Sequence, residues 1–133
     1  MNLVQVIHER WAAATALNAL LPVSRVYTGA SFDPVLPLAV IAKQSDKPDS
    51  YDSDGSAIDV VVLRMRVLHA QYDAAAAIIH ETKKAFDRTS FDLAGSDTVQ
   101  NMQRINDSEQ QRSDGAWEMT IDFECTVYLA SGA

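Results

Sequence analysis

One stretch of the chain is rich in aspartate, and closely spaced carboxylates are what a calcium site requires. The stretch covers residues 44 to 57 (QSDKPDSYDSDGSA). Its aspartates are Asp46, Asp49, Asp52 and Asp54. The run from Ser50 to Gly55 imitates the start of an EF-hand loop, with glycine at the sixth place. However, Ser50 stands where that motif has aspartate, and Val61 stands where it needs a bidentate glutamate. We therefore expect no bound metal, and a flexible loop over 44 to 57.

Three further carboxylates recur near the end of the chain, at Glu118, Asp122 and Glu124. Residues two apart on a strand lie about 7 Å apart on one face, so such carboxylates could perform acid–base catalysis if the pKa of one were raised. Acidic residues on an exposed strand more often keep the surface soluble, or pair with basic residues of a neighbouring strand such as Arg64 and Arg66. This second interpretation is favoured, and we expect no catalytic residue here.

The remaining reactive side chains are three histidines and one cysteine. The histidines fall on different expected elements, and no second histidine follows His80-Glu81 at the spacing of the zinc-protease helix. Cys125 falls on the apolar face of an expected strand, where burial makes a thiol inert. The motifs GxxxxGK[ST], GxGxxG and GxSxG are absent from the sequence. The sequence therefore predicts neither an enzyme nor a cofactor.

Alternating side chains predict the strands that would position these groups. From Trp117 to Leu129, apolar and polar residues alternate, which indicates one long strand with a buried and a wet face. Residues 59 to 69 alternate in the same way and place two arginines on the polar face. The uninterrupted apolar run over 38 to 42 is typical of a buried strand.

Apolar residues at steps of three and four predict two helices, over residues 3 to 21 and 72 to 86. Residues 25 to 28 are rich in β-formers, and residues 97 to 107 pattern weakly as a further strand. This order fits a single α+β domain over residues 1–133, with two helices packed on one face of an antiparallel or mixed β-sheet.

The overall charge limits the partners that the protein can have. Eleven Lys and Arg against 18 Asp and Glu give a formal net charge of −7, which repels phosphate groups and argues against a general nucleic-acid or membrane binder. Cys125 is the only cysteine, so no internal disulfide can form. The sequence has no apolar run of bilayer length and no signal-like start, so we expect the protein to be made in a cytoplasm.

The order of these segments resembles that of a known family. An N-terminal helix is followed by Arg25-Val26-Tyr27, the proline-led strand from Pro37 to Ile41 and a loop. A strand then runs into an alanine-rich helix (VVLRMRVLHAQYDAAAAIIHETKKAF), and the chain closes on two strands ending in WEMTIDFECTVYL. This order, over about residues 3 to 129, is similar to that of the tail-completion, or tail-terminator, proteins of long-tailed bacteriophages and phage-like particles.

The resemblance implies a non-enzymatic virion protein, made in the bacterial host cytoplasm and located at the tail or neck of the particle. Copies of such a protein form a ring, usually six-fold, at the end of the tail tube. The ring stops polymerisation of the tail tube protein and presents a surface to the head connector or neck proteins. DNA would pass through it without specific binding, since like charges suppress phosphate contacts.

Residues of the polar strand faces and of the loop are the expected interface residues. They are Arg64, Arg66, Tyr51, Asp52, Asp54, Glu118, Asp122 and Glu124. The loop is expected to meet the tube or connector, and the two arginines are expected to meet acidic residues of a neighbouring copy. Two alternatives remain open. One is a head-completion or connector protein of the neck of the same particle, and the other is a stand-alone cytoplasmic domain that binds a small ligand.

Overall fold

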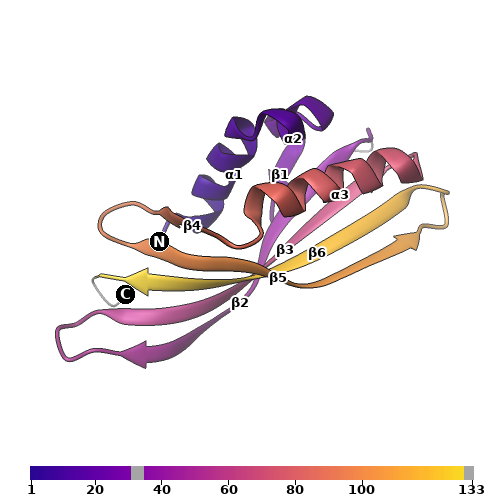
Figure 1. The fold of residues 1–133 in the computed structure, drawn as a ribbon. Helices are drawn as coiled ribbons and strands as arrows, with labels where there is room; N and C mark the ends of the chain where they lie inside the picture. The colour runs from indigo at the N-terminus through magenta and orange to yellow at the C-terminus, as the bar shows by residue number, and fades with distance from the viewer. Residues whose placement is uncertain (31–34, 131–133) are drawn as a thin grey trace.

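Helices cover one face of a long, twisted β-sheet, and the other face is largely open (Figure 1). A computed structural model describes residues 1–30 and 35–130. The described helices are α1 (Leu3–Ala13), α2 (Thr15–Leu20), the short 3-10 helix η1 (Val23–Arg25) and α3 (Tyr72–Phe86). The described strands are β1 (Val26–Thr28), β2 (Leu38–Tyr51), β3 (Ala57–His69), β4 (Thr89–Asp92), β5 (Thr98–Gln111) and β6 (Trp117–Leu129). None of the described helices is long and apolar enough to cross a membrane.

The six strands form one mixed sheet in the order β1-β2-β3-β6-β5-β4. β1 runs parallel to β2, and every other neighbouring pair is antiparallel. β3 and β6 form the centre and pair over their full length, from Ala57 opposite Leu129 to His69 opposite Trp117. The α+β class predicted from the sequence is therefore confirmed, and the sheet is of the mixed kind.

The core lies between the central strands and the helices. Its β6 members are Met119, Ile121, Phe123, Cys125, Val127 and Leu129, and its β3 members are Val61, Leu63, Met65 and Val67. The helices supply Ile7, Trp11, Leu17, Ile78 and Phe86. Fully burying a large apolar side chain contributes about 1.5–3 kcal/mol before conformational entropy is subtracted. A one-residue shift of β6 would bury its polar face instead, so this packing fixes the register.

The N-terminal helical segment is divided in two, whereas the sequence pattern predicted one helix over 3 to 21. Ala14 has an extended backbone (φ −79°, ψ 91°) and separates α1 from α2. The break lets the chain fold back, so that the indole N–H of Trp11 donates a hydrogen bond of 2.9 Å to the carbonyl of Leu21. Trp11 is fully buried, and its ring lies 6.3 Å from that of Phe86 on α3.

The loop predicted over 44 to 57 is wrong for most of its length. β2 continues to Tyr51 and pairs with β3, and only a tight turn separates the two strands. The polar and proline-containing sequence is accommodated because β2 has register shifts at Lys43/Ser45 and Pro48/Ser50, and because a strand at the sheet edge tolerates proline. Pairing with the apolar strand β3 overrides the local preference of these residues for a loop.

The same turn closes both long hairpins. In the β2–β3 turn, the N–H of Gly55 donates to the carbonyl of Asp52 at 3.2 Å, and the Asp54 carboxylate accepts the backbone N–H of Ser56 at 2.9 Å. In the β5–β6 turn, the corresponding bonds join Gly115 to Arg112 at 2.9 Å and Ala116 to Asp114 at 3.0 Å. Gly55 and Gly115 have φ of 91° and 87°, a conformation that glycine adopts without strain. The two turns lie at opposite ends of the sheet (Figure 1).

Candidate assembly interface

The sheet face that turns away from the helices, here called the open face, carries a half-buried ion pair at its centre. Arg64 on β3 lies opposite Asp122 on β6. Its Nε donates to Asp122 Oδ1 at 2.9 Å and its Nη2 donates to Oδ2 at 3.2 Å. The hydrogen bonds to the Asp122 carboxylate, and secondly its negative charge, raise the pKa of the Arg64 guanidinium. The cross-strand pairing that the sequence suggested for these two residues is therefore confirmed.

Asp122 does not lie on a wet surface, contrary to the expectation from the alternating pattern. The residue is buried, because the arginine covers its carboxylate while keeping its own side chain 41% exposed. A two-bonded carboxylate under its partner cannot at the same time serve as a free contact for another molecule. Arg64 and Asp122 are thus already satisfied within one chain.

Three other expected interface residues also lie on the open face. Arg66 pairs in register with Thr120 and, within the described part of the chain, makes no ion pair. Glu118 accepts a hydrogen bond of 3.0 Å from the side chain of Gln110, and Glu124 lies half-buried on the same strand. The structure therefore brings the two arginines and the three carboxylates together on β3 and β6.

The end of the open face near β1 is apolar. Leu38 and Val40 on β2 and Leu68 on β3 form a small buried cluster, against which Tyr27 and Leu36 pack. The uninterrupted apolar run of β2 is explained by this arrangement, because its two faces contact two different clusters.

The hairpin tip is separate from the charged centre of the open face. Tyr51 is 71% exposed at the end of β2. Asp52 and Asp54 both accept hydrogen bonds from the Ser56 hydroxyl, at 2.9 and 2.7 Å, and this bonding lowers the pKa of Asp54. The residues that imitate an EF-hand therefore hold the turn, and no described group of three or more metal-ligating side chains is placed to hold an ion.

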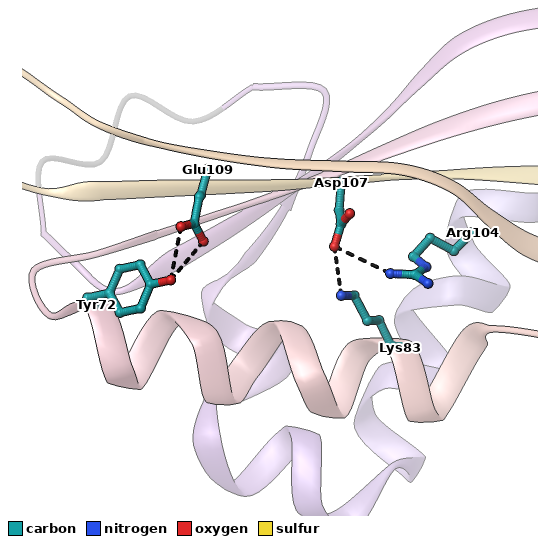
Figure 2. Close-up of polar contacts among 5 residues, drawn as sticks. All are labelled: Tyr72, Lys83, Arg104, Asp107 and Glu109. Atoms are coloured by element: carbon teal, nitrogen blue, oxygen red, sulfur yellow. Dashed lines mark hydrogen bonds and ion pairs between the residues drawn. The ribbon is translucent and has the colours of Figure 1, made fainter.

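A second set of polar contacts, which the sequence did not reveal, ties β5 to α3 (Figure 2). Asp107 Oδ2 lies 2.7 Å from Lys83 Nζ and 3.5 Å from Arg104 Nη1. The hydrogen bond from Lys83 is the main reason why the pKa of Asp107 is lowered. The Tyr72 hydroxyl donates to Glu109 Oε1 at 2.9 Å, and this bond raises the pKa of Tyr72.

These contacts fix the half of β5 that has no strand beside it on the outside. β4 pairs with β5 only between Thr98 and Met102. The backbone N–H of Arg104 donates a hydrogen bond of 2.8 Å to Asp87 Oδ1. Beyond that point, the outer edge of β5 makes no backbone hydrogen bond to another described element. The exposure of this half on both faces explains why the strand over 97 to 107 patterned weakly in the sequence.

β2 is open in the same way at the opposite edge and the opposite end of the sheet. β1 pairs with β2 only from Ala39 to Ile41, and Gly29 N–H donates to the Ile41 carbonyl at 2.8 Å. From Ala42 onward, the outer edge of β2 makes no backbone hydrogen bond to another described element. Among residues 1–30 and 35–130, two strand edges are therefore open, and such edges are the surfaces that most readily accept another strand.

A groove of about 380 Å³ lies beside the β2–β3 hairpin, at the start of α1. Its charged lining residues are Lys43, Asp46 and Asp59. The pKa of Asp59 is raised, chiefly because it shares a hydrogen bond with the Asp46 carboxyl. Asp46 also lies 3.6 Å from Lys43, so these groups satisfy one another within the strand pair.

The charged centre of the open face and the two open strand edges are surfaces through which this α+β domain can contact other chains. The chain belongs to the tail completion protein gp17 family, which it matches over residues 5–128. This is a family of structural tail proteins, as the resemblance in the sequence implied.

Comparison with solved structures gives an independent match at the level of the fold. The chain is similar to a chain in the virion of the native gene transfer agent (GTA) particle, with a TM-score of 0.71 at 15% identity. The match covers 92% of this chain and 91% of that one. None of the curated proteins matches the sequence.

Proposed function

We propose that this protein is the subunit of a six-fold ring that caps the tail tube of a phage-like particle. The observation that carries the proposal is the family match, because it spans all described strands and helices except the first residues and the end of β6. The similarity to a chain of a virion supports the same conclusion at the level of the fold. The ring ends polymerisation of the tube protein and presents the surface for joining to the head connector or neck proteins.

The charge of the chain suits a channel for DNA. A net charge of −7 repels the phosphate backbone, so DNA slides through the ring without being held. The expected interface residues that remain available are Arg66, Glu118 and Glu124 on the open face and Tyr51 at the hairpin tip. We propose that Arg66 meets an acidic residue of another virion protein or of a second copy, because it makes no ion pair within the described residues.

Deletion of the gene in the strain that produces the particle tests the function, with negative-stain microscopy of the lysate as the readout. Overlong headless tubes are expected, because nothing would stop the growth of the tube. Tails of normal length beside separate filled heads would instead place the protein on the head side of the joint, as a connector. Intact particles would overturn both assignments.

A variant of Arg66 tests the open face in the same strain. Arg66→Glu should reduce the yield of joined particles, whereas Arg112→Glu, on the exposed β5–β6 turn, should leave the yield unchanged. Equal yields from the two variants would remove Arg66 from the interface while leaving the deletion result in force.

A further inference from the structure

The open half of β5 lacks several of the features that normally protect a strand edge, although it carries two charged side chains, Asp107 and Glu109. Its outer half runs from Asn106 to Gln111 (NDSEQQ) and contains no proline, no lysine and no register shift. Asp107 and Glu109 are held by α3, so the strand is fixed before any partner arrives. A fixed edge with unpaired backbone groups of this kind is a template for strand addition.

The open half of β2 is its complement in direction and in charge. β2 and β5 run in opposite directions within the sheet, so β2 of a second copy, placed beside β5 with the same face outward, pairs antiparallel. From Ala42 to Lys47 (AKQSDK), Lys43 is paired with Asp46 and Lys47 adds a positive charge, whereas the β5 half carries two acids and no base, with Asp107 paired to Lys83 and Glu109 bonded to Tyr72. Pairing β5 with β5 would bring like charges together, and Pro48 limits pairing further along β2.

We infer that copies of this chain join edge to edge, with β2 from Ala42 to Lys47 of one copy adding to β5 from Asn106 to Gln111 of the next. This inference rests on the proposed ring and names its seam. Each copy has one edge of each kind, so the contact is head-to-tail, the kind of contact that forms a ring when the rotation between copies closes. β4 and β1 cover the other half of each edge, so successive copies are offset along the strands. Such an offset makes the strands of the ring slant relative to its axis, as in a β-barrel.

Cross-linking between engineered cysteines tests the seam in assembled tails. Ser45 on β2 and Ser108 on β5 share the open face, because their pairing partners Val62 and Thr120 lie on that face. Tails are purified from a producing strain that carries Ser45→Cys with Ser108→Cys in place of the native gene, and are treated with a short bis-maleimide. A ladder of linked copies is expected on a denaturing gel. Cys125 is buried, so the native chain provides an unreactive background.

Single variants and a matched control show which two strand edges meet between neighbouring copies. Ser45→Cys alone and Ser108→Cys alone should give no linked dimer, because each site then lacks its partner. Linkage of Ser108→Cys to itself would show β5–β5 pairing and overturn the inference. Ser45→Cys with Ser90→Cys, on the exposed strand β4, should also give no ladder. A ladder from that control, or none from the test pair in tails that contain the protein, would refute the seam. The proposed tail-terminating function is judged by the deletion experiment, so failure of the seam and failure of that function are distinguishable.

Discussion

Arg64 and Asp122 face each other across the two central strands, and their exposures are unequal. The arginine side chain is 41% exposed and the aspartate side chain is 10% exposed. Two hydrogen bonds, of 2.9 and 3.2 Å, join them. Water can therefore replace the aspartate as a partner of the arginine, but cannot readily replace the arginine as a partner of the aspartate.

Removing either member of this pair should have unequal effects on stability. Arg64→Met leaves a buried carboxylate without its partner and should lower the free energy of unfolding by about 2–3 kcal/mol. Asp122→Asn leaves a half-exposed guanidinium and should cost only about 1 kcal/mol. Urea unfolding at one fixed protein concentration measures both values, and Arg66→Met is the control, with an expected change below about 0.5 kcal/mol. Equal losses for the two main variants would contradict the account.

The ion pair between Lys83 and Asp107 should give an acid-dependent part of the stability. Because the pKa of Asp107 is lowered in the folded protein, the pair stabilises above the unfolded pKa of about 3.9, and this stability is lost as pH falls through the folded pKa. Lys83→Met should therefore cost about 0.5 kcal/mol at pH 7, and the cost should shrink as the pH falls through the folded pKa of Asp107. The measurement is urea unfolding of both proteins from pH 7 downward into the acid range.

Lys84 provides the matched control for this pH dependence. It lies one residue further along α3, is 63% exposed, and its Nζ is 3.6 Å from Glu81 Oε1. Lys84→Met should change stability by less than the Lys83 variant at every pH. A difference between native and Lys83→Met protein that did not shrink as the pH was lowered would show that packing, and not charge, is what Lys83 supplies.

The two tryptophans should differ sharply in their tolerance of substitution. Trp11→Phe removes buried volume and leaves the Leu21 carbonyl without its donor, so we expect a loss of about 2–3 kcal/mol. Trp117 is only half-buried, and its ring lies 4.9 Å from that of Tyr72, a contact that phenylalanine preserves. Trp117→Phe should cost about 1 kcal/mol or less. Thermal unfolding, monitored by circular dichroism, measures both losses. A larger loss for Trp117→Phe than for Trp11→Phe would contradict this ranking.

The thiol of Cys125 should report on opening of the core. Burial raises its pKa to about 12, so at pH 8 the thiol is protonated and out of reach of reagents. Native protein should react with a thiol-specific disulfide reagent far more slowly than protein unfolded in urea. Ser108→Cys adds an exposed thiol and should react at once with a single equivalent. Fast labelling of both thiols in the native variant would mean that the sheet opens locally around β6.

The parts of the fold that were predictable from the sequence are those in which one side is buried and the other is not. The alternation along β6 and the three-and-four spacing along α3 both arise from such a boundary, and both elements appear where they were predicted. The half of β2 beyond Ala42 and the half of β5 beyond Gln103 are exposed on both faces. Hydrophobic patterning carries no information there, and only pairing with β3 and β6 makes these halves strands.

The candidate interface was predictable to a similar degree. The alternation of polar and apolar residues predicted that Arg64 and Asp122 lie on one face of the sheet. It could not show that the two side chains bind each other and so are not free to bind another chain. The contacts of Asp107 and Glu109 with α3 depend on the register of β5, which the sequence leaves open because of the shift between Arg104 and Asn106. Open edges depend on where β1 and β4 stop, and strand ends are the least certain feature of any pattern.

The twin turns of the two long hairpins have a consequence for how the chain folds. Each turn joins strands that are neighbours in sequence, so the β2–β3 and β5–β6 hairpins close small loops and can form early, within microseconds. Joining β3 to β6 pairs residues as distant in the chain as Ala57 and Leu129, and this closure carries the larger entropic cost. We therefore expect the slow step of folding to be the meeting of two preformed hairpins, and the ion pair between Arg64 and Asp122 lies between the two strands, β3 and β6, that then come together.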